Sequence, residues 1–322
     1  ERTITMTQPA PLEAVINEVH QQSINHFDET IPVCEMSFDD LENMWVSGKQ
    51  VEILPSAQKL LANRLKVPFS YLSRCPSDLQ AKNLNYWIDL EAKRRGTFFC
   101  RFDGHNLRAV FTDRYRPLDN MEILSQVIQH GFDPSAKVQY AIDDGMFLVK
   151  IPEYARAFGV NIGYGKLDEI VPGVSFANSE VGLLAFSIEA FFYRLICTNG
   201  LIAKTSSTVS RFKHISNRGL ENFPETLAGV VRDSIRKQEQ FKLSRHETVD
   251  DPIRSIERFS QRFSLSQSET EVVRQSYYLE QGATMFHIIN AFTRAAQDSN
   301  LETIQAYRLE KAGGQILSLV RP

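Results

Sequence analysis

Hydrophobic positions recur at helical spacing close to the start of the chain. Leu12, Val15 and Val19 fall on one face, which predicts a helix over residues 11–27. Similar spacing predicts several helical pieces over residues 56–93, starting at a serine that can cap the first of them. Between these helices, residues 32–54 are expected to form short strands and a small helix around residues 38–45.

A different periodicity takes over in the middle of the chain. Residues 97–102 and 107–112 alternate as strands do and flank a turn-forming segment, which predicts a β-hairpin. Two further strands are predicted over residues 137–142 and 146–151, after a helix over residues 118–131. The apolar stretch inside residues 174–203 is expected to form a strand and a helix.

Past residue 222 the pattern is helical almost to the end. Helices are predicted over residues 223–246, 251–263, 267–280, 284–297 and 300–317. Runs of helices and runs of strands, rather than alternating units, favour an α+β fold with a central antiparallel strand-rich region and a helical C-terminal third. We expect a core domain over residues 1–220 and a helical region over residues 221–322 that packs on this core.

The composition is that of a globular protein. Of 322 residues, 43% are hydrophobic and 23% are charged, and the formal net charge is only −3. Affinity for a polyanion would therefore have to come from local basic patches. The four cysteines stand far apart, without the spacing of a zinc or redox site, which favours a reducing cytoplasm. No apolar run approaches the length of a membrane span, so no membrane partner is expected.

Familiar catalytic and cofactor motifs are missing from the sequence. It holds no phosphate-binding G-x-x-x-x-G-K-[ST] loop, no G-x-G-x-x-G, no H-E-x-x-H and no G-x-S-x-G. We therefore expect no cofactor and no resident metal. The acidic pairs at residues 143–144 and 250–251 lie beside glycine or proline, which is typical of turns.

The first candidate for chemistry is the segment over residues 107–120, where a predicted strand leads into a predicted helix. Arg114 and Arg116 could grip phosphate there, and Tyr115 could stack on a base. Arg108 on the preceding strand would join them. In the alternative interpretation, Asp113 and Asp119 neutralise Arg114 and Arg116, and the segment is a structural corner.

The second candidate extends over residues 178–217. No acidic residue lies between Glu189 and Glu221, and the stretch is rich in serine, threonine and basic residues. Such a loop could follow a nucleic-acid backbone, although a solvated basic loop would have the same composition. The contact residues expected here are Arg194, Asn199, Lys204, Arg211, Lys213 and His214.

Two weaker signals precede the hairpin. The basic run over residues 93–95 could extend a basic face, or it could be an ordinary solvated helix end. Residues 57–75 have the spacing of a helix-turn-helix, a pattern that common helical hairpins share.

Several sequence blocks resemble the phage/plasmid-like protein family, a domain of unknown function. These blocks are RAVFTDRYRPLDN, SEVG, RLICTNGL, VPFSYLSRCP followed by NLNYW, and INAFTRAAQ. They occur in order between about residues 50 and 300. The resemblance implies an association with mobile elements and hence with DNA metabolism, such as recombination, replication or defence.

Three hypotheses follow. The leading one is a nucleic-acid-binding protein for single-stranded DNA, acting in recombination or replication and forming a homo-oligomer. The second is a metal-dependent enzyme acting on nucleic acid or nucleotides through Asp113, Asp119 or Glu180. The third is a protein-interaction factor in phage or plasmid conflict with the host, using the helical tail.

Overall fold

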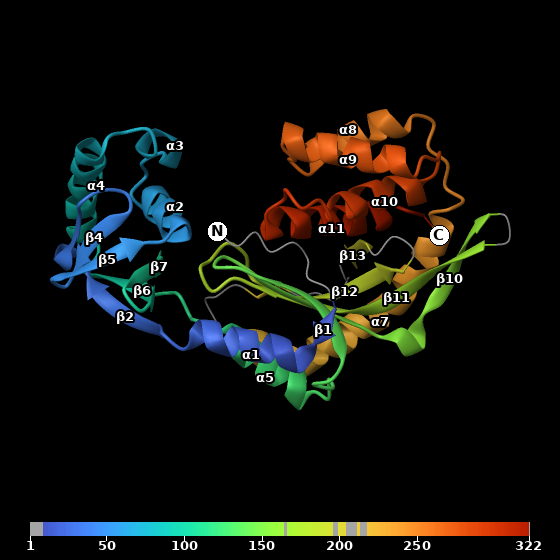
Figure 1. The fold of residues 1–322 in the computed structure, drawn as a ribbon, viewed down its shortest axis with the longest axis horizontal. Coiled ribbons are helices and arrows are strands. Elements are labelled where there is room, and N and C mark those ends of the chain that lie inside the picture. Colours follow the sequence, from blue (N-terminus) through green and yellow to red (C-terminus); the bar gives the residue numbers. More distant parts are fainter. Residues whose placement is uncertain (1–8, 164–165, 196–198, 204–210, 213–217, 322) are drawn as a thin grey trace.

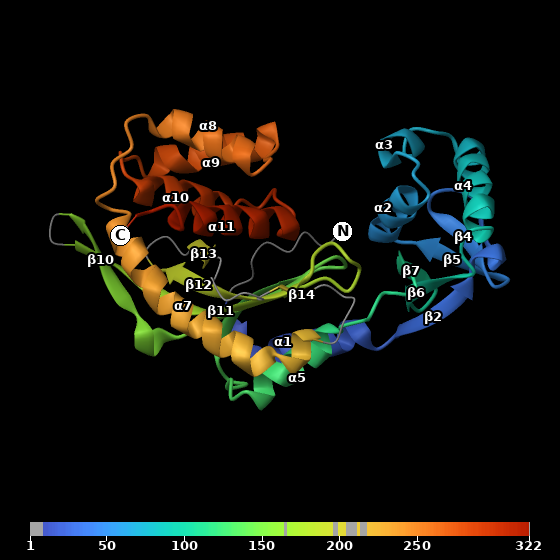
Figure 2. The same ribbon diagram turned by 180° about the vertical axis from the view of Figure 1, so that it is seen from behind.

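The computed structural model describes residues 9–163, 166–195, 199–203, 211–212 and 218–321. They form two units that lie side by side, each with its own sheet (Figures 1 and 2). We call residues 26–111 the N-terminal unit and the rest of the described chain the main unit. Because residues 9–25 already belong to the main unit, the chain passes between the units twice.

A six-stranded sheet and three helices make up the N-terminal unit. Its strands are β2 (His26–Pro32), β3 (Met36–Phe38), β4 (Asn43–Val46), β5 (Lys49–Ile53), β6 (Thr97–Asp103) and β7 (Asn106–Phe111), in the order β2-β6-β7-β5-β4-β3. Its helices are α2 (Pro55–Arg64), α3 (Phe69–Leu72) and α4 (Ser77–Ala92), with a 3₁₀ turn, η1 (Val33–Glu35). Only β5 and β7 pair in parallel. A separate hydrophobic cluster, including Leu61, Leu84 and Phe98, fills this unit.

The larger sheet lies in the main unit. Its strands are β1 (Ala10–Pro11), β8 (Lys137–Ile142), β9 (Phe147–Pro152), β10 (Phe158–Gly163), β11 (Lys166–Asn178), β12 (Phe186–Arg194), β13 (Asn199–Ala203) and β14 (Arg211–Phe212). The main path is β1-β8-β9-β11-β12-β13, with β10 on β11 and β14 on β12, and every pair is antiparallel.

Helices cover both faces of this sheet (Figures 1 and 2). They are α1 (Leu12–Ser23), α5 (Asn120–Gln129), α6 (Arg218–Glu221), α7 (Phe223–Leu243), α8 (Pro252–Arg262), α9 (Gln267–Leu279), α10 (Met285–Ala295) and α11 (Thr303–Leu317), with a 3₁₀ turn, η2 (Tyr154–Arg156). One face packs on α1, α5 and α7, and the opposite face lies under α10 and α11. None of the helices in the described ranges is long and apolar enough to cross a bilayer.

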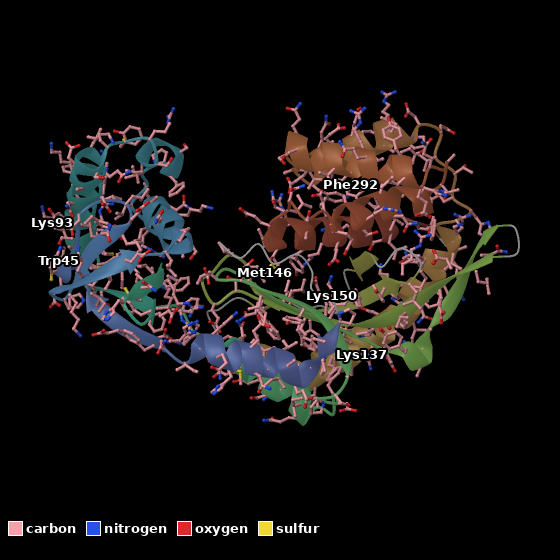
Figure 3. All side chains as sticks on the ribbon, in the orientation of Figure 1. Trp45, Lys93, Lys137, Met146, Lys150 and Phe292 are labelled. Atoms are coloured by element: carbon pink, nitrogen blue, oxygen red, sulfur yellow. The ribbon has the colours of Figure 1, made fainter. Side chains whose placement is uncertain are left out.

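Successive side chains along the strands of the larger sheet point to its two faces in turn. Phe147 and Val149 of β9 join the core under α1 and α5, whereas Lys150 points to the opposite face. There, the register aligns Gln139, Lys150, Ser175 and Glu189 across four neighbouring strands. Helix α11 covers this polar row, as Figure 3 shows for the position of Lys150. Lys150 is fully buried and ion-paired at 2.5 Å with Glu310 of α11.

The predicted fold class is confirmed: the protein is α+β, with antiparallel sheets and a helical C-terminal third. The hairpin over residues 97–112 and the five C-terminal helices are also present. The helix expected around residues 38–45 is wrong, since β3 and β4 occupy that stretch. The helix expected within residues 174–203 is absent from its described part, which consists of strands β11, β12 and β13 and the loop over residues 179–185. The strands described between residues 10 and 212 form two sheets.

Candidate nucleic-acid interface

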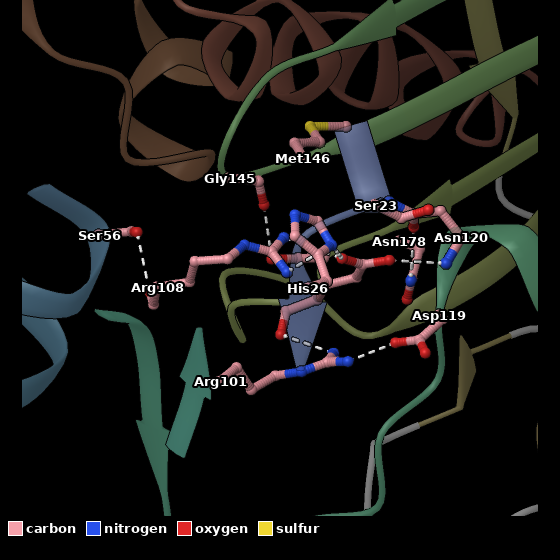
Figure 4. Close-up of polar contacts among 12 residues, drawn as sticks. Ser23, His26, Ser56, Arg101, Arg108, Asp119, Asn120, Gly145, Met146 and Asn178 are labelled. Atoms are coloured by element: carbon pink, nitrogen blue, oxygen red, sulfur yellow. Dashed lines mark hydrogen bonds and ion pairs between the residues drawn. The ribbon is translucent and has the colours of Figure 1, made fainter. Parts of the chain in front are cut away.

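A network of charged groups, in which Arg101, Arg108 and Glu180 are buried, joins the two units. We call His26, Arg101, Arg108, Asp119 and Glu180 the junction cluster (Figure 4). The histidine and the two arginines come from β2, β6 and β7 of the N-terminal unit, and the carboxylates come from the start of α5 and the loop after β11. The cluster therefore fastens the points where the chain passes between the units.

Glu180 is the centre of this network. Its carboxylate accepts a hydrogen bond from Arg108 Nη2 at 2.8 Å and another from the backbone N–H of Asn120 at 2.8 Å. The backbone oxygen of Glu180 accepts from Arg101 Nη1 at 3.3 Å and from the hydroxyl of Tyr115 at 3.2 Å. Arg101 also pairs with Asp28 at 2.8 Å and with Asp119.

The electrostatics of the cluster favour an ionised Glu180 and a neutral His26. Burial alone would raise the pKa of Glu180, but Arg108 and the Asn120 N–H more than offset it, so that pKa lies below its usual value. Burial and the neighbouring Arg108 lower the pKa of His26. His26 Nδ1 lies 3.0 Å from Arg108 Nη1 and, when neutral, can accept its hydrogen bond.

A close aromatic stack stands beside the cluster. The ring of Tyr115 lies parallel to Phe111, with centroids 3.7 Å apart, and Phe99 packs against it. Gly182 approaches this stack with a φ of +81°, and a Cβ added there would lie 2.7 Å from Phe111 Cε1. The glycine of the SEVG block is thus required both by its backbone conformation and by the nearby ring.

This arrangement changes the interpretation of the first candidate segment. Arg108 and Tyr115 are buried in the junction and hold the loop after β11, so neither is placed to contact a nucleic acid. Arg114 and Arg116 are exposed. Arg116 folds back on its own turn and donates to the backbone oxygens of Asp113 and Tyr115. The carboxylates expected to neutralise these arginines do not pair with them among the described residues, because Asp119 pairs with Arg101 and Arg116 bonds only to backbone oxygens. Arg114 has no partner in the described part of the chain.

The carboxylates proposed for metal catalysis do not form a metal site. Asp119 and Glu180 are ion-paired with Arg101 and Arg108, and Asp113 is exposed. Across the described ranges, no three metal-ligating side chains of the histidine, cysteine and carboxylate types gather at one point.

Arg194 in the second candidate segment is also buried. It makes a bidentate ion pair with Glu280, at 2.6 and 2.7 Å, and a further one with Asp168. These contacts attach β12 and β11 to the end of α9. Arg194 is therefore a structural residue that holds the C-terminal helices to the sheet, and its burial leaves it unavailable to a nucleic acid.

The rest of the second segment is only partly described. Lys204, Lys213 and His214 lie outside the described residues, and for Asn199 and Arg211 only the backbone is described. That backbone forms β13 and β14. In β14, residues 211 and 212 pair with the start of β12, at the sheet end that also carries the loop of Glu180. The backbone of this segment therefore reaches the junction end of the main unit.

Basic side chains also gather on the N-terminal unit. Two open clefts of about 660 and 490 Å³ adjoin there and share Arg94 and Arg95. The first lies between the C-terminal ends of α2 and α4, and the second continues past the start of β6 to the turn after β7. Five cationic side chains and two carboxylates line the two clefts: Arg64, Lys66, Arg94, Arg95 and Arg114, with Glu91 and Asp113.

Most of these cations are open to solvent. Lys66, Arg94, Arg95 and Arg114 are exposed, and only Arg95 is ion-paired, to Glu91 at 2.6 Å. Arg64 is half-buried, with its guanidinium over the ring of Phe98. Burial, and after it the nearby Arg95, lowers the pKa of Arg64, whereas Glu91 raises it. A polyanion would relieve the repulsion between Arg64 and Arg95.

The sequence identified only part of this surface. The basic run over residues 93–95 was one of the weaker signals, and Arg114 belonged to the first candidate. Arg64 and Lys66 gave no signal, because they are ordinary residues at the end of a helix until the fold brings them to Arg94 and Arg95. The helix-turn-helix interpretation does not apply here, since α3 is only four residues long.

Comparison with known families shows where the chain belongs. Residues 108–306 match the family described as Domain of unknown function (DUF932), and the chain is a member of it. The match begins at Arg108 of the junction cluster and leaves most of the N-terminal unit outside it. Comparisons with curated proteins and with solved structures give no match.

Proposed function

For this member of the DUF932 family, we propose a role as a nucleic-acid-binding protein that holds single-stranded DNA along the two clefts of the N-terminal unit. The observation that carries the proposal is the concentration of five cationic side chains, against two carboxylates, around adjoining clefts in a chain whose net charge is −3. The wider role in recombination or replication of mobile elements rests on the sequence resemblance and is part of the same proposal.

The chemistry of the clefts suits a phosphate backbone. Guanidinium groups pair with phosphate oxygens through parallel N–H donors, and the hydroxyls of Thr97 and Thr112 add neutral donors to the second cleft. Because Arg94 and Arg95 belong to both clefts, successive phosphates could follow one continuous path. Displacement of condensed counterions by such contacts supplies affinity that falls as salt rises.

Binding to a labelled dT30 oligonucleotide, followed by fluorescence anisotropy at 50 and 200 mM salt, tests the proposal. With about five phosphate contacts, affinity should fall about 100-fold between these salt concentrations. Arg94→Ala combined with Arg114→Ala should weaken binding at the lower salt. The matched control is Arg254→Ala with Arg262→Ala, two exposed arginines of α8. Absence of binding at 50 mM salt would exclude this function.

A further inference from the structure

An exposed tryptophan stands beside the first cleft. Trp87 lies on α4, and 40% of its surface is accessible to solvent. Glu91, which lines the cleft, follows four residues later on the same helix. Residues four apart in a helix lie one above the other, separated by about one turn of 5.4 Å. The backbone position of Trp87 therefore lies about one turn before the residue of α4 that lines the basic cleft.

Contacts of neighbouring residues show what the face of α4 that carries Trp87 packs against. Gln80 precedes Trp87 by two turns on the same face and donates to the backbone oxygens of Leu72 and Cys75 at 3.0 Å. The backbone N–H of Leu41 also donates to Gln80 at 3.1 Å, so this part of the α4 face contacts α3 and the loop after β3. Further along α4, Glu91 lines the cleft together with the end of α2. Leu84 and Ile88 occupy the adjoining face and are buried in the core of the unit.

The indole is also supported from the side. Tyr86 packs against Trp87 edge to face, with ring centroids 5.2 Å apart and an interplanar angle of 85°. A rigid, partly exposed aromatic face costs little side-chain entropy when a planar ligand stacks on it.

We infer that Trp87 stacks on an unpaired nucleobase of the strand whose phosphates occupy the basic clefts. The inference rests on the proposed function, and it adds a residue that gives the protein its preference for single-stranded over duplex DNA. A base in a duplex is already stacked and hides its faces, whereas every base of a single strand can offer a face to an aromatic ring. The arginines would then bind either form of DNA, and Trp87 would favour the single-stranded form.

The chain offers a direct readout, because it contains only two tryptophans. Trp45, the other one, lies on β4 and donates to Asp39 at 3.0 Å. In Trp45→Phe, the emission of the remaining tryptophan should be quenched as dT20 is added, and this quenching should saturate together with binding measured by anisotropy. An emission that stays unchanged while dT20 binds would overturn the inference.

Affinity supplies the second test. Trp87→Ala should weaken dT20 binding at least about fivefold, and up to about 100-fold, while leaving binding to a 20-base-pair duplex within about twofold. Trp87→Phe should retain most of the single-strand affinity, which guards against misfolding of the alanine variant. Equal losses for both forms of DNA would contradict a stacking role. If wild type binds dT20 with a steep salt dependence and Trp87→Ala binds it equally well, the stacking inference fails while the proposed function stands. If no oligonucleotide binds, the inference and the proposed function both fail.

Discussion

Replacing Glu180 by alanine should loosen the joint between the two units. The Glu180 side chain is only 7% exposed and its partner Arg108 only 9%. Removal of the carboxylate leaves a buried guanidinium without its counter-charge and the Asn120 N–H without its acceptor. Breaking a buried ion pair on one side costs about 3–5 kcal/mol. For a chain of this length each kcal/mol corresponds to roughly 1.5 °C, so Tm should fall by about 4–7 °C.

The assay is thermal unfolding by circular dichroism, combined with limited proteolysis at the junction. Glu153→Ala is the matched control, because Glu153 forms a 2.9 Å ion pair with Arg156 but is 51% exposed. Such a surface pair contributes at most about 1 kcal/mol. A double-mutant cycle with Arg108→Ala should show strong coupling, since the second substitution removes the charge that the first left unpaired. If Glu180→Ala is no less stable than Glu153→Ala, the junction cluster does not hold the units together.

Three further substitutions probe the same architecture. Lys150→Met alone should lower the free energy of unfolding in urea by about 3–5 kcal/mol, because it leaves Glu310 buried without its partner. Adding Glu310→Leu should recover most of that loss, and a lasting loss in the double variant would contradict this explanation. Gly182→Ala should cost about 1–3 kcal/mol in the same assay, and a second change, Phe111→Leu, should relieve the steric part. The pKa of His26 is lower in the folded protein than in the unfolded chain, so the unfolded chain binds more protons as pH falls below 6.5. The free energy of unfolding should therefore decrease as pH falls from 6.5. His26→Gln should reduce this pH dependence.

Local pattern was sufficient for much of the fold. The hairpin over residues 97–112 and the C-terminal helices are regular, periodic segments whose apolar faces are buried where the spacing indicates. The long strand β11 was missed in its first half, because residues 166–173 mix polar residues with proline and glycine. Its pairing with β9 and β12 forms through contacts distant in sequence, which single-sequence periodicity does not contain.

The candidate site was harder to predict for a related reason. Composition identifies an arginine but not the carboxylate that faces it after folding. Arg108 and Arg194 belong to basic-looking stretches, yet Glu180 and Glu280 neutralise them from loops far along the chain. Conversely, Arg64 becomes part of a basic surface only because the fold brings the ends of α2 and α4 together. Charge patterns along the chain therefore identified basic residues without separating the structural ones from the exposed ones.

The slope of log affinity against log salt for dT30 tests the central claim most directly. For single strands the slope is about −0.7 for each phosphate contact, so five contacts give about −3.5. Arg94→Ala with Arg114→Ala should bring the slope to about −2, while Arg254→Ala with Arg262→Ala leaves it unchanged. A wild-type slope near zero, or an equal change in both double variants, would contradict a phosphate path along the clefts of the N-terminal unit.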